Sequence, residues 1–346
     1  MARSDHRMQL PRSPLVSTLI LGLAAATVAA APEPAATKQP AQAATEPTQP
    51  TSGPPAQPER MGPRPCRGWR GTRVVLLGTG TPVADPSRSG PALALVVDGR
   101  PYLVDAGPGV VRRAAAGLRR RCPRIPVGRL ERLFVTHLHS DHTAGLADVI
   151  LTPWVLGRKR PLRVFGPPGI QSMVGFVLQA YREDIALRRA SDRPLQAEGI
   201  RVLAEEVAPG EVYSDDRVRV QAFAVRHGLW AHAYGYRFDT ADRSVVVSGD
   251  TAPSEALVRA CDGCDVLIHE VYAQAGLHRR EANWRRYLRS HHTSAVELGR
   301  LARRARPRLL VLVHQLNLGV PPAGLLAEVR RSFRGRVVYG KDLMIL

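Results

Sequence analysis

Three histidines and an aspartate lie close together in the segment 136–142, which reads THLHSDH and directly follows the apolar residues Leu133–Val135. Side chains two residues apart on an extended chain point to the same side, so His137 and His139 leave the expected strand together. In a hydrophobic core, each of these rings would need its own hydrogen-bonding partner. A metal ion satisfies all of them at once, and zinc accepts both histidine and aspartate as ligands. The segment therefore predicts a metal site at the end of a buried strand.

Asp141 and His142 belong to the same segment, where a helix is expected to begin, but a metal cage needs further ligands from elsewhere in the chain. Three distant polar residues, His227, Asp250 and His314, each follow a hydrophobic run that predicts a strand. Each one alone also fits a cap or a turn. Because polar residues at the edge of a rigid sheet can converge on one site, we interpret the whole set as metal ligands.

Hydrophobic runs bounded by turn residues predict one domain with many short strands. The expected strands are Thr72–Leu77, Ala92–Val97, Tyr102–Val104, Leu133–Thr136, Leu162–Phe165, Val218–Val225, Tyr234–Phe238, Ser244–Ser248, Val266–His269, Leu309–His314 and Val337–Tyr339. Helices are expected at Val110–Arg121 and at about 170–190, 254–260, 293–305 and 322–333. Hairpins occur together with strand–helix alternation, which favours an α/β fold of two mixed sheets with helices outside.

Residues 1–30 have the layout of a secretory signal peptide. Basic Arg3, Arg7 and Arg12 precede an apolar run, and small residues near Val28–Ala30 fit a cleavage site. An uncleaved anchor is the alternative, although the strongly apolar part is short for a membrane span. We therefore expect a periplasmic or secreted protein without stable membrane insertion once the signal is removed.

A proline-rich segment, residues 31–65, follows the signal. It holds ten prolines in 35 residues and few large apolar side chains, so it cannot build a core and is expected to be a disordered linker. Of the net charge of +19, residues 1–30 carry +2 and the linker none, which leaves +17 on residues 66–346. This last region is the predicted folded domain, and its charge favours an anionic partner.

Four cysteines, Cys66, Cys122, Cys261 and Cys264, allow three disulfide pairings. The spacing of Cys261 and Cys264 is typical of zinc and redox motifs, but no second pair with ligand spacing accompanies it. Reduced thiols or a local bridge are the favoured interpretations. Cys66 with Cys122 is then the other pair able to form a bridge, and the sequence leaves the pairing open.

The order of these features resembles the metallo-β-lactamase superfamily, and within it the ribonuclease Z-like branch. The resemblance covers nearly all of residues 72–346. It rests on LLGTGTP (76–82), YLVDAGPG (102–109), FVTHLHSDHTAGL (134–146), VFGPPG (164–169), VRHG (225–228) with YGYRF (234–238), VVVSGDT (245–251), DVLIHEVY (265–272) and HHTSAVELG (291–299). It implies a four-layer αββα sandwich with metals at one edge of the two sheets.

The resemblance also implies two zinc ions per chain. The first ion would be held by His137, His139 and His227, and the second by Asp141, His142 and His314. Asp250 would bridge both ions. A hydroxide between the two ions would be the nucleophile. Manganese would also be tolerated, because aspartate and histidine bind it.

Three residues have catalytic roles by the same resemblance. Asp141 would orient the attacking water or accept its proton. His292 matches the histidine of the family's HST-type loop, which stabilises the transition state or protonates the leaving oxygen, and His291 is the competing assignment. Glu270 matches a motif whose carboxylate orients such a histidine.

The expected activity is that of an exported hydrolase of a small anionic ester, either a phosphodiester or a sulfate ester, as in neighbouring phosphodiesterases and arylsulfatases. The alternative is a ribonuclease Z-type endoribonuclease that binds nucleic acid. Such enzymes carry a tRNA-gripping arm, which the resemblance places between the YGYRF and SGDT motifs, and residues 239–247 are too few to contain it. A β-lactamase or a scaffold without activity is disfavoured by the bridging Asp250 and the complete ligand set. Related proteins often form homodimers, but nothing in the sequence identifies an interface.

Overall fold

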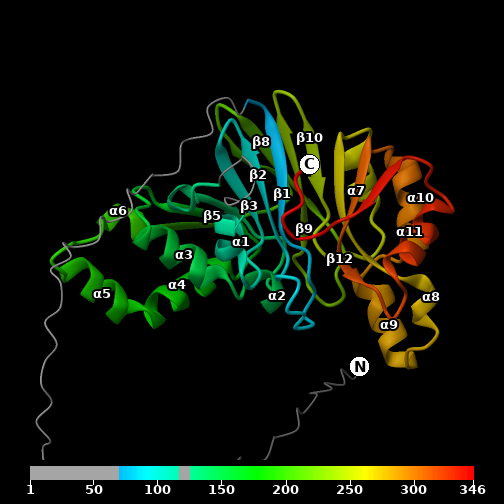
Figure 1. Ribbon diagram of the computed structural model, residues 1–346, viewed down its shortest axis with the longest axis horizontal. Helices are drawn as coiled ribbons and strands as arrows, with labels where there is room; N and C mark the ends of the chain where they lie inside the picture. Colours follow the sequence, from blue (N-terminus) through cyan, green and yellow to red (C-terminus); the bar gives the residue numbers. More distant parts are fainter. Residues whose placement is uncertain (1–69, 117–124) are drawn as a thin grey trace, which may run out of the picture. The chain divides into compact units, whose positions relative to one another are not determined.

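The computed structural model describes residues 70–116 and 125–346, which form two β-sheets packed face to face (Figure 1). The first sheet has the strand order β1-β2-β3-β4-β5-β6 and the second has the order β13-β12-β11-β10-β9-β8-β7. The strands of the first sheet are β1 (Thr72–Gly78), β2 (Ala92–Val97), β3 (Arg100–Val104), β4 (Arg132–Phe134), β5 (Leu162–Gly166) and β6 (Val202–Glu206). Those of the second are β7 (Gly210–Ser214), β8 (Val218–Ala224), β9 (Tyr234–Thr240), β10 (Ser244–Val247), β11 (Val266–Tyr272), β12 (Leu309–Leu316) and β13 (Arg336–Tyr339).

Both sheets are mixed. Strands β1 to β3 pair antiparallel, and β3 to β6 continue in parallel. In the second sheet, β7 to β10 pair antiparallel and β10 to β13 in parallel. Parallel strands all end at the same edge of their sheet, so residues that directly follow β3, β4, β10 and β12 are brought to one side of the molecule.

Helices cover the outer face of each sheet. On the first sheet lie α1 (Val110–Ala116), α3 (Leu146–Val155) and α4 (Ile170–Ala180), and on the second lie α7 (Glu255–Cys261), α10 (Ala295–Ala305) and α11 (Pro322–Arg330). The other helical segments are α2 (Ser140–Thr143), α5 (Arg182–Ala190), α6 (Ala197–Ile200), α8 (Gln274–Leu277), α9 (Ala282–His291) and a 3-10 turn at Val127–Arg129. The expectation of a four-layer αββα sandwich is confirmed.

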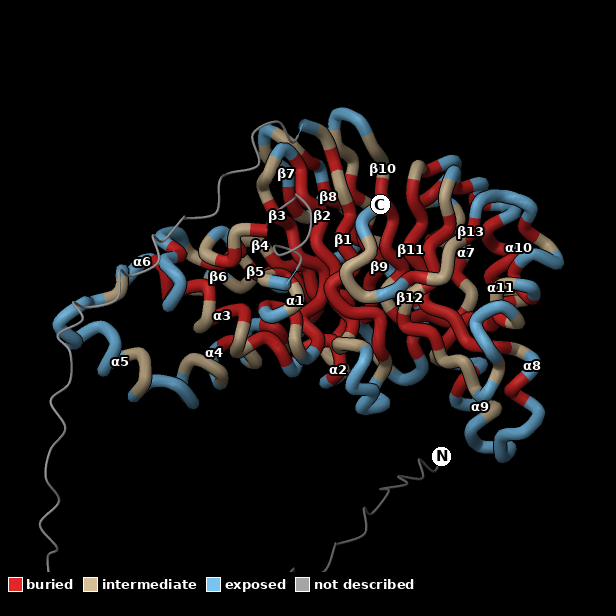
Figure 2. The backbone as a smooth tube through the Cα atoms, in the orientation of Figure 1, coloured by how far each residue is buried: buried red, intermediate tan, exposed pale blue. Residues whose placement is uncertain are grey.

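The core lies in three layers, between the sheets and under each set of helices (Figure 2). Strands β2 and β11 are buried along their whole length, because both of their faces are covered. This explains the continuous apolar sequence of β2 and of the first half of β11, Val266–Ile268, which do not alternate with polar residues. Between the two sheets, Phe134 stacks on Phe165 and meets Phe238 edge to face, which joins the inner faces of the sheets.

Several elements differ from the sequence expectation. The helix expected at about 170–190 is two helices, α4 and α5, which meet at Tyr181. Strands β6 and β7 were not expected, since β6 is partly exposed at a sheet edge and lacks a strong apolar pattern. Helices α3 and α9 were also missed. Of the helix expected at Val110–Arg121, the structure describes α1 up to Ala116, and the remainder lies outside the described residues.

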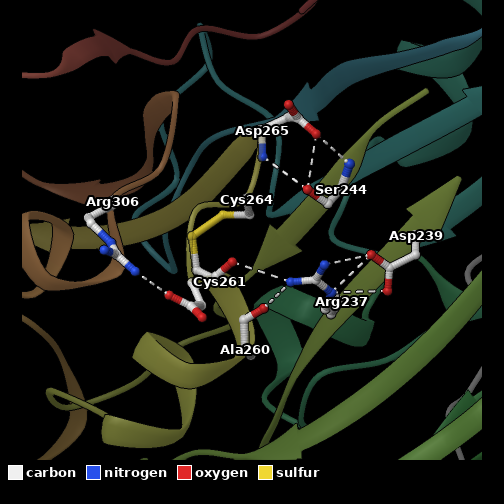
Figure 3. The surroundings of a disulfide bond; sticks show 9 residues. Arg237, Asp239, Ser244, Ala260, Cys261, Cys264, Asp265 and Arg306 are labelled. Atoms are coloured by element: carbon white, nitrogen blue, oxygen red, sulfur yellow. Dashed lines mark hydrogen bonds and ion pairs between the residues drawn. A yellow bond between two sulfur atoms is a disulfide. The ribbon is translucent and has the colours of Figure 1, made fainter.

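Cys261 and Cys264 form the local disulfide bridge that was one of the favoured interpretations (Figure 3). It closes the turn between α7 and β11, where Asp262 and Gly263 have positive φ angles of 28° and 84°. The Arg237 side chain donates to the Ala260 carbonyl at 2.6 Å and to the Cys261 carbonyl at 3.3 Å. The bridge thus closes a structural turn, and its sulfurs are not available to a metal.

The expected signal, linker and second cysteine pair (residues 1–30 and 31–65, Cys66 and Cys122) lie outside the described residues. Within residues 70–116 and 125–346, no helix has the length and apolar character that a bilayer crossing requires.

Candidate metal centre

Asp105 holds the histidine-rich loop in place. It directly follows β3, and its carboxylate accepts hydrogen bonds from the Thr136 amide at 2.8 Å and from the Thr136 hydroxyl. The other side of the carboxylate accepts the Nδ1 proton of His142 at 2.8 Å. With Nδ1 occupied in this way, the Nε2 lone pair of His142 faces the site. Because β3 and β4 are neighbouring parallel strands, the buried Asp105 carboxylate at the end of β3 fixes the histidine-rich loop that follows β4.

A first group of ligand atoms is formed by His137, His139 and His227. The His139 Nδ1 atom lies 3.1 Å from His137 Nε2 and 3.0 Å from His227 Nε2. One proton on His139 cannot satisfy two nitrogens. These separations fit the edges of a coordination shell in which each nitrogen lies about 2.0–2.1 Å from a zinc ion. His227 donates from Nδ1 to the His291 carbonyl at 2.7 Å, which frees its Nε2 lone pair for the site.

A second group is formed by Asp141, His142 and His314. The His314 Nε2 atom lies 3.2 Å from an Asp141 oxygen and 3.3 Å from an Asp250 oxygen. His142 Nε2 lies 3.4 Å from the other Asp250 oxygen. Asp250 also groups with His137, so its carboxylate lies between the two sets of ligand atoms.

A β-bulge aims His314 into the site. Glu270 of β11 pairs with Val313, and the next residue, Val271, pairs with Gln315, so His314 is the extra residue of β12. Its φ angle is 44°, in the left-handed region that such bulges adopt. The bulge turns the imidazole out of the sheet face toward Asp141 and Asp250.

The residues present fit a divalent metal. The buried His142 Nε2 atom, which faces Asp141 and Asp250, has no hydrogen-bond partner in the described residues, although buried polar groups rarely stay unsatisfied. Several histidine and aspartate atoms instead lie within 4.8 Å of one another, in overlapping groups of three. Grouping these polar atoms does not stabilise a protein core unless a cation binds them.

Burial and charge prepare the side chains for such a cation. Burial lowers the pKa of the His137 imidazole well below its ordinary value and that of His227 to about 4, so both rings stay neutral at neutral pH. Burial opposes ionisation of Asp250, but the charges of His314 and His142 outweigh it and hold the pKa of this carboxyl well below its ordinary value. Conversely, burial disfavours a charged His142, yet Asp250 and Asp105 raise its pKa well above the ordinary value. The carboxylates of the cluster are thus balanced by a charged His142 imidazole, and a bound metal cation would take the place of that charge.

His292 and Glu270 lie beside this cluster. His292 Nδ1 is 3.4 Å from a Glu270 oxygen and 3.9 Å from Asp250, and its ring stacks on His314. The other Glu270 oxygen accepts hydrogen bonds from the amides of Thr293 and Thr251. Burial lowers the pKa of His292, but Glu270 and Asp250 outweigh this and raise it.

The structure brings all nine residues singled out in the sequence to this one place. His291, the competing assignment, is partly exposed at the rim and stacks on Tyr287. Sequence reasoning missed the roles of Asp105 and Trp230. Asp105 has the same signal as Asp250, a polar residue directly after a strand. Trp230, whose indole N–H donates to His139 Nε2 at 2.7 Å, has no signal in the sequence.

Comparison with known proteins decides the family. The family model described as the beta-lactamase superfamily domain matches residues 100–315. The chain is 35% identical over 277 residues to a ribonuclease Z of Mycolicibacterium paratuberculosis. This match covers 78% of this chain and 96% of the relative. This chain belongs to the metallo-β-lactamase superfamily, in its ribonuclease Z-like branch.

Solved structures with this fold agree with that membership. The superfamily protein YhfI from Bacillus subtilis superposes with a TM-score of 0.62 at 17% identity, over 80% of this chain and 98% of YhfI. The human short-form tRNase Z superposes with a TM-score of 0.60 at 20% identity, over 79% and 98%. Membership makes the chain a metal-dependent hydrolase of ester bonds, and its histidine and aspartate clusters suit a divalent metal.

Proposed function

We propose that this chain is a dinuclear zinc enzyme that hydrolyses phosphodiester bonds in RNA, in the manner of ribonuclease Z. The observation that carries the proposal is the complete set of seven converging ligand residues, with Asp250 between its two halves. This set occurs in a chain that covers 96% of a protein named ribonuclease Z. The relatives thus support the ribonuclease alternative better than the hydrolysis of a small sulfate ester.

The metal ligands follow the assignment made from the sequence. His137, His139 and His227 would hold one ion, Asp141, His142 and His314 the other, and Asp250 both. Two such ions would supply Lewis-acid stabilisation of the scissile phosphate and lower the pKa of the attacking water. Zinc is the natural occupant of this histidine-rich set, and manganese would also be accepted.

The chain's own residues complete the chemistry. Asp141 lies at the edge of the cluster, next to a surface hollow lined by residues 81–86 and 88–90, and is placed to orient a water or accept its proton. Glu270 binds the backbone of the His292 loop and faces His292 Nδ1. The Glu270 carboxylate, 3.4 Å from His292 Nδ1, would favour a charged imidazole, whose Nε2 would supply the proton to the leaving oxygen.

The short interval between the YGYRF and SGDT motifs, residues 239–247, which was expected to be too short for a gripping arm, contains a tight hairpin turn. Ser244 pairs with Asp239 as β9 turns into β10, so nothing is inserted between them. An RNA substrate would therefore need to be bound elsewhere on the surface. Export through residues 1–30 stays a prediction, and N-terminal sequencing of the protein made in its own cell tests it.

The function is tested by giving the metal-loaded protein four substrates in parallel. These are a precursor tRNA with a 3′ trailer, an unstructured oligoribonucleotide, bis-nitrophenyl phosphate and nitrophenyl sulfate. We expect cleavage of RNA and of the phosphodiester, abolished in His137→Ala. Turnover of the sulfate alone would contradict the proposal and return the chain to the arylsulfatase interpretation.

A further inference from the structure

Helix α9 presents a row of aromatic rings that leads from the surface to the metal centre. The Trp284 and Tyr287 rings lie 5.4 Å apart, and the Tyr287 ring stacks on His291 at 3.9 Å. The His291 ring in turn lies 5.1 Å from His227. Trp284 is 54% exposed and Tyr287 38% exposed, whereas most large aromatic side chains elsewhere in the described residues are buried. We call these three side chains, Trp284, Tyr287 and His291, the aromatic row.

The aromatic row is firmly attached to the loop that carries His227. The Gly228 amide donates to the Ser290 carbonyl at 3.0 Å, and His227 Nδ1 donates to the His291 carbonyl at 2.7 Å. Gly228 has a φ angle of 56°, and any Cβ there would collide with the His291 ring. The last turn of α9 is therefore fixed against a candidate metal ligand, while the first turn projects into solvent, as Figure 2 shows.

The surroundings of the row are strongly basic. Residues 279–291 contain five arginines, Arg279, Arg280, Arg285, Arg286 and Arg289, and a single carboxylate, Glu281. None of these arginines forms an ion pair with a carboxylate in the described part of the chain. On the flank of α9 away from the row, Arg285 and Arg289 line a hollow of about 480 Å³. Only Leu288 of α9 is buried, so this helix is not explained by packing alone.

We propose that the aromatic row binds single-stranded RNA by stacking on its bases next to the scissile phosphate, with the α9 arginines contacting neighbouring phosphates. This inference rests on the proposed function, since it names where that substrate is held. Exposed aromatic rings among arginines are the usual means of binding single strands, because every base offers a face for stacking and every nucleotide a charge.

The test measures binding and cleavage separately. The metal-loaded protein is titrated into a labelled oligoadenylate of about ten nucleotides, long enough for a typical single-strand site, with phosphorothioate linkages that slow cleavage. Fluorescence anisotropy gives the Kd. The variants are Trp284→Ala with Tyr287→Ala, the rescue pair Trp284→Phe with Tyr287→Phe, and the control Phe176→Ala, which removes an exposed ring from α4 on the other sheet. Thermal melting checks that each variant is folded.

We expect the alanine pair to raise Kd by about 10-fold or more, because stacking contributes appreciably for each base. The phenylalanine pair and the Phe176→Ala control should bind like the wild type. Arg285→Ala with Arg286→Ala should reduce the dependence of Kd on salt between about 50 and 200 mM.

An unchanged Kd in the alanine pair would overturn the inference, and so would equal weakening in the Phe176→Ala control or no binding by the wild type. Cleavage of the unmodified oligonucleotide is followed in parallel. If the wild type binds through the row but does not cleave, the proposed function fails and the binding surface stands.

Discussion

The metal centre and the aromatic row are neighbours, yet they differ in how far their side chains are buried. In the metal centre, His137, His142 and His227 are buried, and each has its outer nitrogen bonded to a neighbouring oxygen. In the row, Trp284 and Tyr287 are exposed, and their ring contacts are with each other, with His291 and, for Tyr287, with His292. Rigid, desolvated groups suit chemistry, whereas an exposed ring on a helix suits a substrate of variable sequence. The comparison assigns catalysis to the first region and recognition to the second.

The largest expected effect is a loss of metal and of kcat that is confined to variants of the metal centre. Asp250→Asn removes the charge between the two ligand groups, so we expect loss of bound metal and a fall in kcat of about 10³-fold, since metal ions contribute several kcal/mol to such transition states. Elemental analysis and RNA cleavage measure the two quantities. Trp284→Ala, measured beside it, should retain its metal. Loss of metal from both variants would show that the regions are one unit.

A smaller effect is expected from His292→Gln. If His292 moves a proton to the leaving oxygen, kcat should fall by about 10²-fold or more, with the metal content unchanged. The same measurement on His291→Gln tests the competing assignment, with KM followed beside kcat because His291 also belongs to the aromatic row. A larger loss of kcat in the His291 variant would reverse the two assignments.

The metal centre and helix α9 also show what a sequence can and cannot predict. The ligands were predictable because they cluster in one motif or follow apolar strands, and the whole set, unlike its single members, has no other good explanation. The His314 bulge, the role of Asp105 and the position of Trp230 depend on how separate strands align, which no local pattern encodes. Helix α9 was missed because only Leu288 is buried, so it lacks the apolar periodicity that marks a packed helix.

Asp105→Asn should weaken metal binding without abolishing it. The variant keeps the shape of the side chain but loses the charge that accepts the His142 proton, and such outer partners typically contribute about 10- to 100-fold in metal affinity. Competition with a zinc-sensitive dye measures this affinity. Wild-type affinity would mean that Asp105 only supports the backbone of the Thr136 loop.

The smallest effect concerns a charged cluster remote from both regions. Burial opposes ionisation of Asp215, but hydrogen bonds from Tyr213, the Arg217 amide, Tyr102 and Arg100 outweigh it and lower its pKa to about 2. Because this pKa is depressed in the folded state, the stabilisation is present above the ordinary pKa of about 4 and is lost as the pH falls toward 2.

Thermal melting of wild type and Asp215→Asn tests this. The wild type should melt higher at pH 6, and the difference should shrink as the pH is lowered through this window. A difference that is independent of pH would show that the carboxylate charge is not responsible. Metal content and RNA affinity should be the same in both proteins, which makes this variant a reference for the other two regions.

The central claim is that seven side chains from both sheets form one dinuclear centre that cleaves RNA. Its most direct test is to strip the protein of metal and follow RNA cleavage while zinc is added back in known equivalents. We predict that activity rises with added zinc and reaches its plateau at two ions per chain. Cleavage that is independent of zinc, or a plateau at one ion, would contradict the account.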